Sequence, residues 1–202
     1  MKKNIGHSFI YIALITLYSY FEFIIKSISI ESKLTYILIV AACILFCLAI
    51  YYIYKYFLRK NNPYHFEEEK VTKYNIKWFI LFLISALLIQ YFGSLFDPTN
   101  SKSQITFVGI AITVFVAPVV EELICRGIFF AFFLKRKSQY TSMFLILLTS
   151  SLIFAILHLR YNIISFTNVL LVGFILGSTY IKTRKIIFPI LIHMILNLIS
   201  FF

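Results

Sequence analysis

The sequence predicts an all-α bundle of about seven transmembrane helices, forming one multi-pass membrane domain. Of its 202 residues, 61% are hydrophobic and 13% are charged, and the mean hydropathy is +0.91. A soluble domain carries about 25% charged residues. The apolar residues also fall in long runs separated by short charged clusters, which is the pattern of helices that cross a bilayer. Finally, successive loops alternate between many and few basic residues, as expected when they lie on opposite sides of a membrane.

Seven apolar runs are expected to form the membrane helices. They cover residues 8–25, 34–57, 76–96, 105–134, 142–158, 164–181 and 186–202. The first run lacks a small-x-small cleavage site and is rich in Tyr and Phe, so we interpret it as a retained helix and not as a signal peptide. The fourth is long for a bilayer at about 1.5 Å per residue and is expected to tilt or project. The last three are near the lower limit of about 17 residues for a span.

The distribution of Lys and Arg predicts that the N-terminus is inside. Fourteen of the 19 basic residues lie on the predicted cytoplasmic side: Lys2, Lys3, Lys55, Arg59, Lys60, Lys70, Lys73, Lys77, Lys135, Arg136, Lys137, Lys182, Arg184 and Lys185. Four lie on the opposite side: Lys26, Lys33, Lys102 and Arg160. Basic clusters beside spans also account for the net charge of +11. We therefore expect a lipid bilayer as partner and no nucleic acid.

The predicted spans use up most of the chain and leave no room for a separate soluble domain. Residues 1–104 hold three spans and residues 105–202 hold four. We expect the two segments to form one membrane domain together.

Polar residues interrupt the apolar runs in the second half of the chain. A charge at bilayer depth costs at least about 2.5–3.5 kcal/mol, so such residues are candidates for function. The fourth run contains Glu121, Glu122 and Arg126. Residues four apart share a helix face, so Glu122 and Arg126 are expected to pair. Glu121 lies about 100° round the helix and needs another partner or a functional reason. Pro118 predicts a kink or local opening just before them.

The fifth and seventh runs add imidazole and amide groups. Phe154 and His158 are four residues apart, and His193 and Asn197 have the same spacing. Taken singly, a His or Asn in a membrane helix is usually an interhelical hydrogen-bonding residue. Measured from the predicted cytoplasmic ends, Glu121, His158, Asn197 and His193 lie about 21, 24, 18 and 12 Å up their helices. We expect the four to meet in the middle to outer part of the bilayer.

A carboxylate beside two imidazoles and an amide suits the activation of water. Glu121 would accept a proton from water, one His would orient the water, and the other His with Asn197 would stabilise the oxyanion. Glu121, His158 and His193 would also suit zinc with an open fourth position. The residues alone do not choose between these mechanisms, although the zinc signature H-E-x-x-H is absent. We expect no cofactor, with zinc as the alternative.

These motifs resemble the CPBP intramembrane proteases, also called the Abi family, which includes CAAX proteases and bacteriocin-processing enzymes. The family pattern is E-E-x-x-x-R, then F-x-x-x-H, then H-x-x-x-N or D, on three successive catalytic helices. The matching residues here are Glu121, Glu122, Arg126, Phe154, His158, His193 and Asn197, flanked by Ala117, Pro118, Gly127, Gly173, Gly177, Tyr180 and Pro189. The resemblance covers roughly residues 105–200, and the first three spans carry none of it.

The resemblance implies an endopeptidase that acts within the membrane, with residues 105–202 as its catalytic part. Glu121 would be the catalytic base, His158 would share in water activation, and His193 with Asn197 would form the oxyanion site. Glu122 and Arg126 would support the site. The family is described both as metalloproteases and as metal-free, glutamate-dependent enzymes. The expected substrate is a membrane-associated peptide or a membrane-protein segment, and the expected location is the cell membrane.

Two other functions remain open. A bacteriocin self-immunity protein or membrane scaffold of the same fold would use the motif as structural glue without catalysis. A transporter or proton-relay channel also lines its path with Glu and His. The sequence shows no inverted repeat or pair of interrupted helices, which argues against a transporter.

Overall fold

The computed structural model of the protein describes residues 2–28, 32–96, 107–134, 140–158 and 162–201. The regular structure in these ranges is helical and contains no strand. Its elements are α1 (Lys2–Ser27), α2 (Lys33–Lys60), α3 (Lys73–Phe96), α4 (Phe107–Ala111), η1 (Ile112–Val116), α5 (Ala117–Glu122), η2 (Leu123–Ile128), α6 (Phe129–Phe133), α7 (Tyr140–Leu157), α8 (Ile163–Thr183) and α9 (Ile187–Ile199). The predicted all-α membrane helix bundle is confirmed.

Several of these helices are long and apolar enough to cross a membrane. They are Gly6–Ile25 within α1, Lys33–Lys60, Lys73–Phe96 and Ile163–Thr183. The apolar helices Ser142–Leu157 and Ile187–Ile199 are shorter. The fourth predicted span is one unbroken helical run over residues 107–133, in which α-helical and π-helical turns alternate. Its predicted start at Ile105 and the predicted end of the last span at Phe202 lie outside the described residues.

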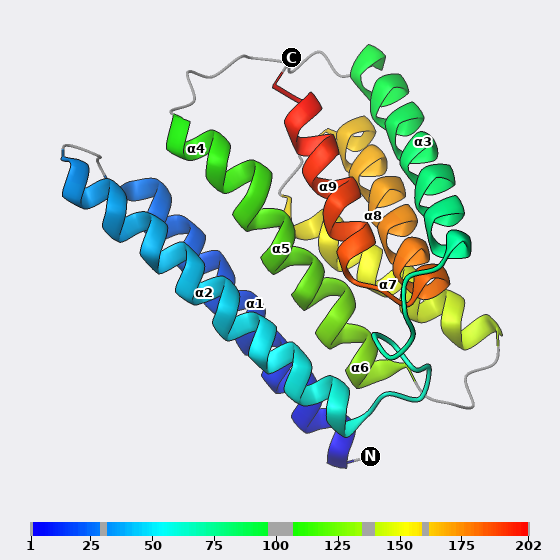
Figure 1. Cartoon of the computed structure of the whole chain (residues 1–202). Coiled ribbons are helices and arrows are strands. Elements are labelled where there is room, and N and C mark those ends of the chain that lie inside the picture. Colours follow the sequence, from blue (N-terminus) through cyan, green and yellow to red (C-terminus); the bar gives the residue numbers. More distant parts are fainter. Residues whose placement is uncertain (1, 29–31, 97–106, 135–139, 159–161, 202) are drawn as a thin grey trace.

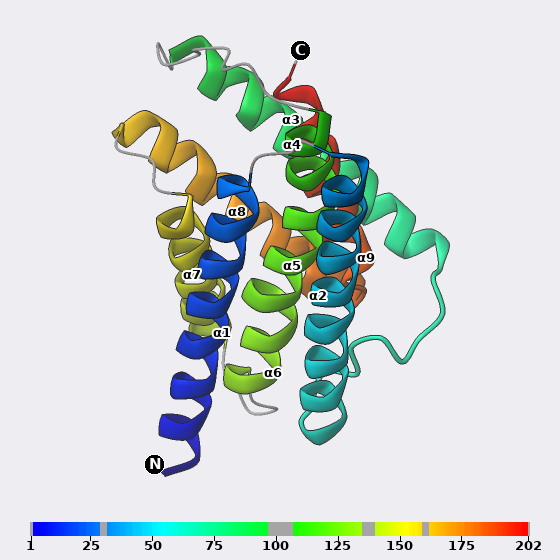
Figure 2. The ribbon, with the colours of Figure 1, turned by 90° about the vertical axis from the view of Figure 1, so that its left-hand side faces the viewer.

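The helical run over residues 107–133 occupies the middle of the bundle. In Figure 1, α1 and α2 lie on one side of this central helix, and α9, α8 and α3 lie on the other. Figure 2 shows α1 and α2 flanking it. In addition, α7 and α3 each pack against α8, and α9 packs against α5. Residues 120–132 of the central helix are consequently all buried.

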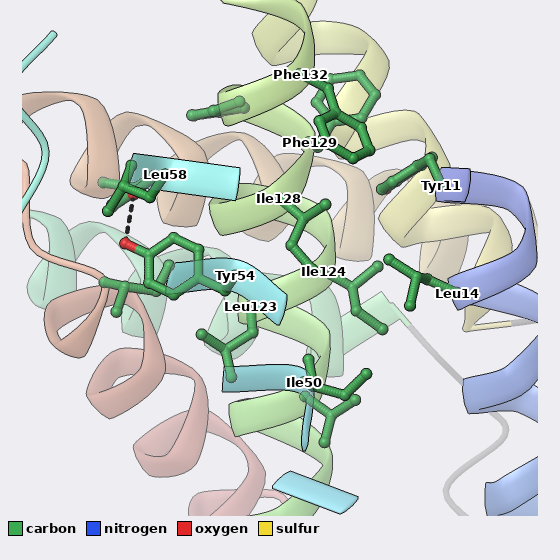
Figure 3. Packing of buried hydrophobic residues seen from close by; sticks show 14 of the residues in the cluster. Tyr11, Leu14, Ile50, Tyr54, Leu58, Leu123, Ile124, Ile128, Phe129 and Phe132 are labelled. Carbon is green, nitrogen blue, oxygen red and sulfur yellow. Dashed lines mark hydrogen bonds between the residues drawn. The ribbon is translucent and has the colours of Figure 1, made fainter. Parts of the chain in front are cut away.

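Apolar side chains of α1 and α2 pack closely against the π-helical segment η2. Figure 3 labels Tyr11, Leu14, Ile50, Tyr54, Leu58, Leu123, Ile124, Ile128, Phe129 and Phe132 in this cluster. Lipid tails are as apolar as these side chains, so close van der Waals packing between helices drives their association. Gly127 permits that packing, because a Cβ atom there would lie 2.7 Å from Cδ2 of the Tyr54 ring.

The loop between α2 and α3 contacts the turn between α8 and α9. The Arg184 carbonyl accepts a hydrogen bond from the Glu67 N–H at 2.9 Å, and the Ile186 N–H donates to Glu67 Oε1 at 2.6 Å. Arg184 and Glu69 form an exposed ion pair at 2.9 Å. The Lys and Arg distribution places these two segments on the same side of the membrane, and their contact agrees with that placement.

Candidate active site

The central helix changes its hydrogen-bonding pattern just before the two glutamates. In η1 the Ala117 N–H donates to Ile112 O, five residues back. Pro118 has no N–H, so neither of these residues donates to the Thr113 carbonyl. Asn197 Nδ2 of α9 donates to that carbonyl instead, at 2.8 Å. The opening predicted at Pro118 therefore takes the form of a π-helical turn whose freed carbonyl is bound by α9.

Glu122 and Arg126 form the predicted ion pair at the centre of the bundle. Both side chains are fully buried, and Arg126 Nη1 donates to Glu122 Oε1 at 2.8 Å. Arg126 Nη2 donates to Gly173 O of α8 at 2.8 Å, and the guanidinium lies 4.2 Å from the centre of the Phe154 ring. Hydrogen bonds and a cation–π contact thus offset the cost of burying this cation. A Cβ atom at position 173 would lie 3.4 Å from Arg126 Nη2 and 3.1 Å from Phe154, so the glycine allows α8 to approach.

Glu121 is held by one oxygen and presents the other to two imidazoles. Its Oε1 accepts a hydrogen bond from the Tyr18 hydroxyl of α1 at 2.6 Å. Its Oε2 is buried and has no direct hydrogen-bond partner among the described residues. This oxygen lies 3.8 Å from His158 Nε2 and 3.8 Å from His193 Nε2. Glu121 therefore takes no part in the ion pair and faces the imidazoles of α7 and α9.

The partners of the two Nδ1 atoms determine which nitrogen of each neutral imidazole carries the proton. His158 Nδ1 lies 2.8 Å from Phe154 O, and His193 Nδ1 lies 3.1 Å from Glu122 Oε1. A carbonyl or carboxylate oxygen can only accept, so each Nδ1 must donate its N–H. In the neutral rings both Nε2 atoms then carry lone pairs directed toward the Glu121 carboxylate.

Three ligand atoms therefore converge on one point. The two Nε2 atoms and a Glu121 carboxylate oxygen all lie within 4.8 Å of one another. Separations of 3.8 Å between nitrogen and oxygen exceed direct hydrogen-bond length and match one intervening atom. In a tetrahedral zinc site, bond lengths of about 2.0–2.1 Å place ligand atoms about 3.3 Å apart. Glu121 Oε2 and the His158 and His193 nitrogens thus fit a zinc ion after a small contraction. They fit a bridging water after a similar expansion, because two hydrogen bonds through one water span about 4.4 Å.

A cavity of about 160 Å³ adjoins these groups. It lies among α3, α7, α8 and α9 and is lined by Gln90, Phe154, His158, Asn168, Val169, Val172, His193, Leu196, Asn197 and Ser200. Six of these ten residues carry polar side chains, so the cavity presents hydrogen-bonding groups beside the two imidazoles. The two imidazoles therefore border open space among these helices.

All six polar residues predicted from the sequence lie in this region. Glu121, Glu122 and Arg126 come from α5 and η2, His158 follows the last residue of α7, and His193 and Asn197 come from α9. The expected meeting at one level is found for Glu121, His158 and His193. Asn197 lines the cavity beside the imidazoles, but one of its amide hydrogens is used by the Thr113 carbonyl.

Known proteins resemble this chain over the same region and beyond it. The family described as "Type II CAAX prenyl endopeptidase Rce1-like" matches residues 103–199. A curated relative, the "Membrane-embedded CAAX protease MroQ" of Staphylococcus aureus (strain USA300), is 32% identical over 184 residues, covering 82% of this chain and 73% of the relative. The chain belongs to the CPBP family of CAAX proteases. No solved structure matches this CAAX protease.

Membership of the CAAX proteases supports an intramembrane endopeptidase activity on a peptide or protein substrate in the membrane. The family match begins at residue 103 and therefore does not include α1. Tyr18 of α1 nevertheless touches Glu121, a contact that the sequence did not predict. The chain has 14 tyrosines. Only its contact with Glu121 in the folded protein distinguishes Tyr18 from the other tyrosines. Its distance along the sequence from the polar residues does not predict that contact.

Proposed function

We propose that this protein hydrolyses a peptide bond of a membrane-associated peptide or membrane protein, using water activated by Glu121 in a multi-pass protein of the cell membrane. One observation carries the proposal. Glu121 Oε2 has no direct hydrogen-bond partner among the described residues and lies 3.8 Å from both His158 Nε2 and His193 Nε2, and the two imidazoles line a cavity. A general base must reach the proton that it takes, and within the part of the chain that the structure describes this carboxylate oxygen has no other partner that would compete for that proton.

In the first step, a water donates its two hydrogens to Glu121 Oε2 and His158 Nε2. These acceptors direct the lone pairs of the water oxygen away from the protein and toward the substrate. The oxygen attacks the carbonyl carbon of the peptide bond while Glu121 takes the proton. His158 keeps its orientation because its Nδ1–H is bonded to Phe154 O.

The attack leaves a negative charge on the oxygen of the substrate carbonyl, and hydrogen-bond donors stabilise that charge. Asn197 has a second amide hydrogen beside the one given to Thr113 O. His193 can donate from Nε2 only when both of its nitrogens carry protons, which makes it an imidazolium beside the Glu122 carboxylate. In the second step Glu121 returns its proton to the leaving nitrogen, the C–N bond breaks, and a carboxylic acid and an amine are released.

Zinc is a second candidate, because three lone-pair atoms converge as they do in catalytic zinc sites. Glu121, His158 and His193 would hold the ion, and the Nδ1 contacts to Phe154 and Glu122 would be the outer partners that such ligands usually have. When bound, zinc would lower the pKa of a water and polarise the substrate carbonyl. Elemental analysis of purified protein tests this candidate. One zinc per chain, lost together with activity on washing with chelator, would replace the metal-free proposal.

The proposal is tested in cells that produce the wild type, Glu121→Gln, or the control Glu68→Gln. Glu68 lies on an exposed loop, so its substitution controls for the loss of one carboxylate. Quantitative proteomics of the membrane fraction should show one or more peptides that are cut in wild-type and Glu68→Gln cells and remain intact in Glu121→Gln cells. Identical membrane peptides in all three would contradict the proposal and favour a structural role for the motif.

A further inference from the structure

The side chain of Tyr18 connects α1 to the proposed reaction centre. Its hydroxyl donates to Glu121 Oε1 at 2.6 Å across 103 residues of sequence. The tyrosine is 5% exposed, so water does not compete for this bond. A hydrogen bond to an ionised acceptor in a buried place is among the stronger interactions available to a side chain.

This bond decides how the Glu121 carboxylate is turned. The terminal torsion of a glutamate is broad and roughly two-fold, so the side chain alone does not fix which oxygen faces the site. Tyr18 holds Oε1, which leaves Oε2 directed toward His158 and His193, 3.8 Å from each Nε2. Without the hydroxyl, the carboxylate could rotate and turn its basic oxygen away from the position of the water.

Tyr11 provides an internal comparison on the same helix. It lies seven residues earlier on the same face and is 4% exposed, which is as buried as Tyr18. Its hydroxyl does not reach a carboxylate, and its polar neighbour among the described residues is the Cys125 thiol, which is a weak hydrogen-bonding group. Both rings fill the apolar interface with the central helix, and phenylalanine would fill it as well. The hydroxyl of Tyr18 therefore has a specific role that packing does not explain.

We propose that Tyr18 is a positioning residue that orients the Glu121 carboxylate for water activation. The proposal rests on the proposed function of Glu121. It extends the functional unit to α1, which lies outside the residues that match the protease family. The Tyr18 hydroxyl is bonded to the Glu121 oxygen that faces away from the imidazoles, so we expect it to act through Glu121 and not by contact with substrate. Its loss should lower kcat and leave KM unchanged.

The test compares Tyr18→Phe with the matched control Tyr11→Phe. Purified full-length protein in lipid vesicles is assayed on the membrane peptide whose processing requires Glu121. We expect Tyr18→Phe to lower kcat about 10-fold or more, because a hydrogen bond to a charged group contributes at least the free energy, about 1.4 kcal/mol, to which a tenfold rate change corresponds. Tyr11→Phe should retain wild-type kcat. Wild-type kcat in Tyr18→Phe would overturn the proposal.

Introducing Tyr18→Phe into a second variant, Glu121→Asp, separates a positioning role from structural support. The shorter carboxylate of Glu121→Asp no longer reaches the Tyr18 hydroxyl, so adding Tyr18→Phe to that variant should lower kcat little further. If Tyr18→Phe lowers kcat by the same factor in the wild type and in Glu121→Asp, Tyr18 supports the fold only and the proposal is wrong. Glu121→Gln separates the two hypotheses. Cleavage by Glu121→Gln would refute the catalytic role of Glu121. If Glu121→Gln is inactive and Tyr18→Phe is fully active, the positioning role of Tyr18 is refuted and the catalytic role of Glu121 stands.

Discussion

Replacing Arg126 by Met should destabilise the folded protein strongly. The substitution keeps an unbranched side chain but leaves Glu122, whose side chain is fully buried, without its cation. Removing one partner of a buried ion pair costs about 3–5 kcal/mol. The Gly173 carbonyl also loses the hydrogen bond from Arg126, although its place inside α8 leaves it the ordinary helical hydrogen bond. At about 2–4 °C per kcal/mol for a chain of this size, the unfolding midpoint should fall by roughly 6–20 °C.

Thermal unfolding of detergent-purified protein, followed by circular dichroism, measures this change. Arg59→Met is the matched control, since Arg59 is exposed near the end of α2. Its unfolding midpoint should stay close to that of the wild type. The double variant Arg126→Met with Glu122→Gln should recover part of the loss, because it removes the buried charge and keeps an amide oxygen for His193.

Two outcomes would refute this reasoning about the ion pair. The first is a wild-type unfolding midpoint for Arg126→Met. The second is a double variant that is no more stable than Arg126→Met alone, since the unpaired Glu122 charge would then not be the cause of the instability.

Further predictions concern the central helix. In Gly127→Ala the new Cβ would meet the buried Tyr54 ring at 2.7–2.9 Å, so the unfolding free energy should fall by about 1–3 kcal/mol. Gly6→Ala, which meets nothing within 4 Å, should not lower it. Asn197→Leu should lower the unfolding midpoint, because the π-helical carbonyl that Asn197 binds is left without a donor, and adding Pro118→Ala should restore part of the stability by supplying an N–H. A double variant as unstable as Asn197→Leu alone would contradict this account of the π-helical turn.

The membrane helices and much of the site were predictable because local sequence determines them. Apolar runs of bilayer length predicted the helices, and the four-residue spacing of Glu122 and Arg126 predicted their ion pair. The rise per residue, with helix ends uncertain by a few residues, allowed Glu121, His158 and His193 to meet, and the structure brings them together. Each of these inferences depends only on the geometry of a single helix and on the cost of charge in a bilayer.

The remaining features depend on contacts between helices and were not predictable. Pro118 indicated an opening but not its π-helical form, nor that Asn197 of α9 would bind the Thr113 carbonyl. The proton position of His193 follows from its contact with Glu122 of the central helix. Tyr18 reaches Glu121 only because α1 packs against the central helix, and no sequence spacing encodes that approach.

Hydrolysis by the purified protein tests the central claim most directly. The membrane peptide that stays intact in Glu121→Gln cells is incubated with the protein in lipid vesicles in ¹⁸O-labelled water and analysed by mass spectrometry. The wild type should yield two fragments, with one labelled oxygen in the new C-terminal carboxylate. Glu121→Gln, with an unfolding midpoint close to that of the wild type, should leave the peptide intact. Cleavage by Glu121→Gln at the wild-type rate would contradict the role of Glu121 as the base.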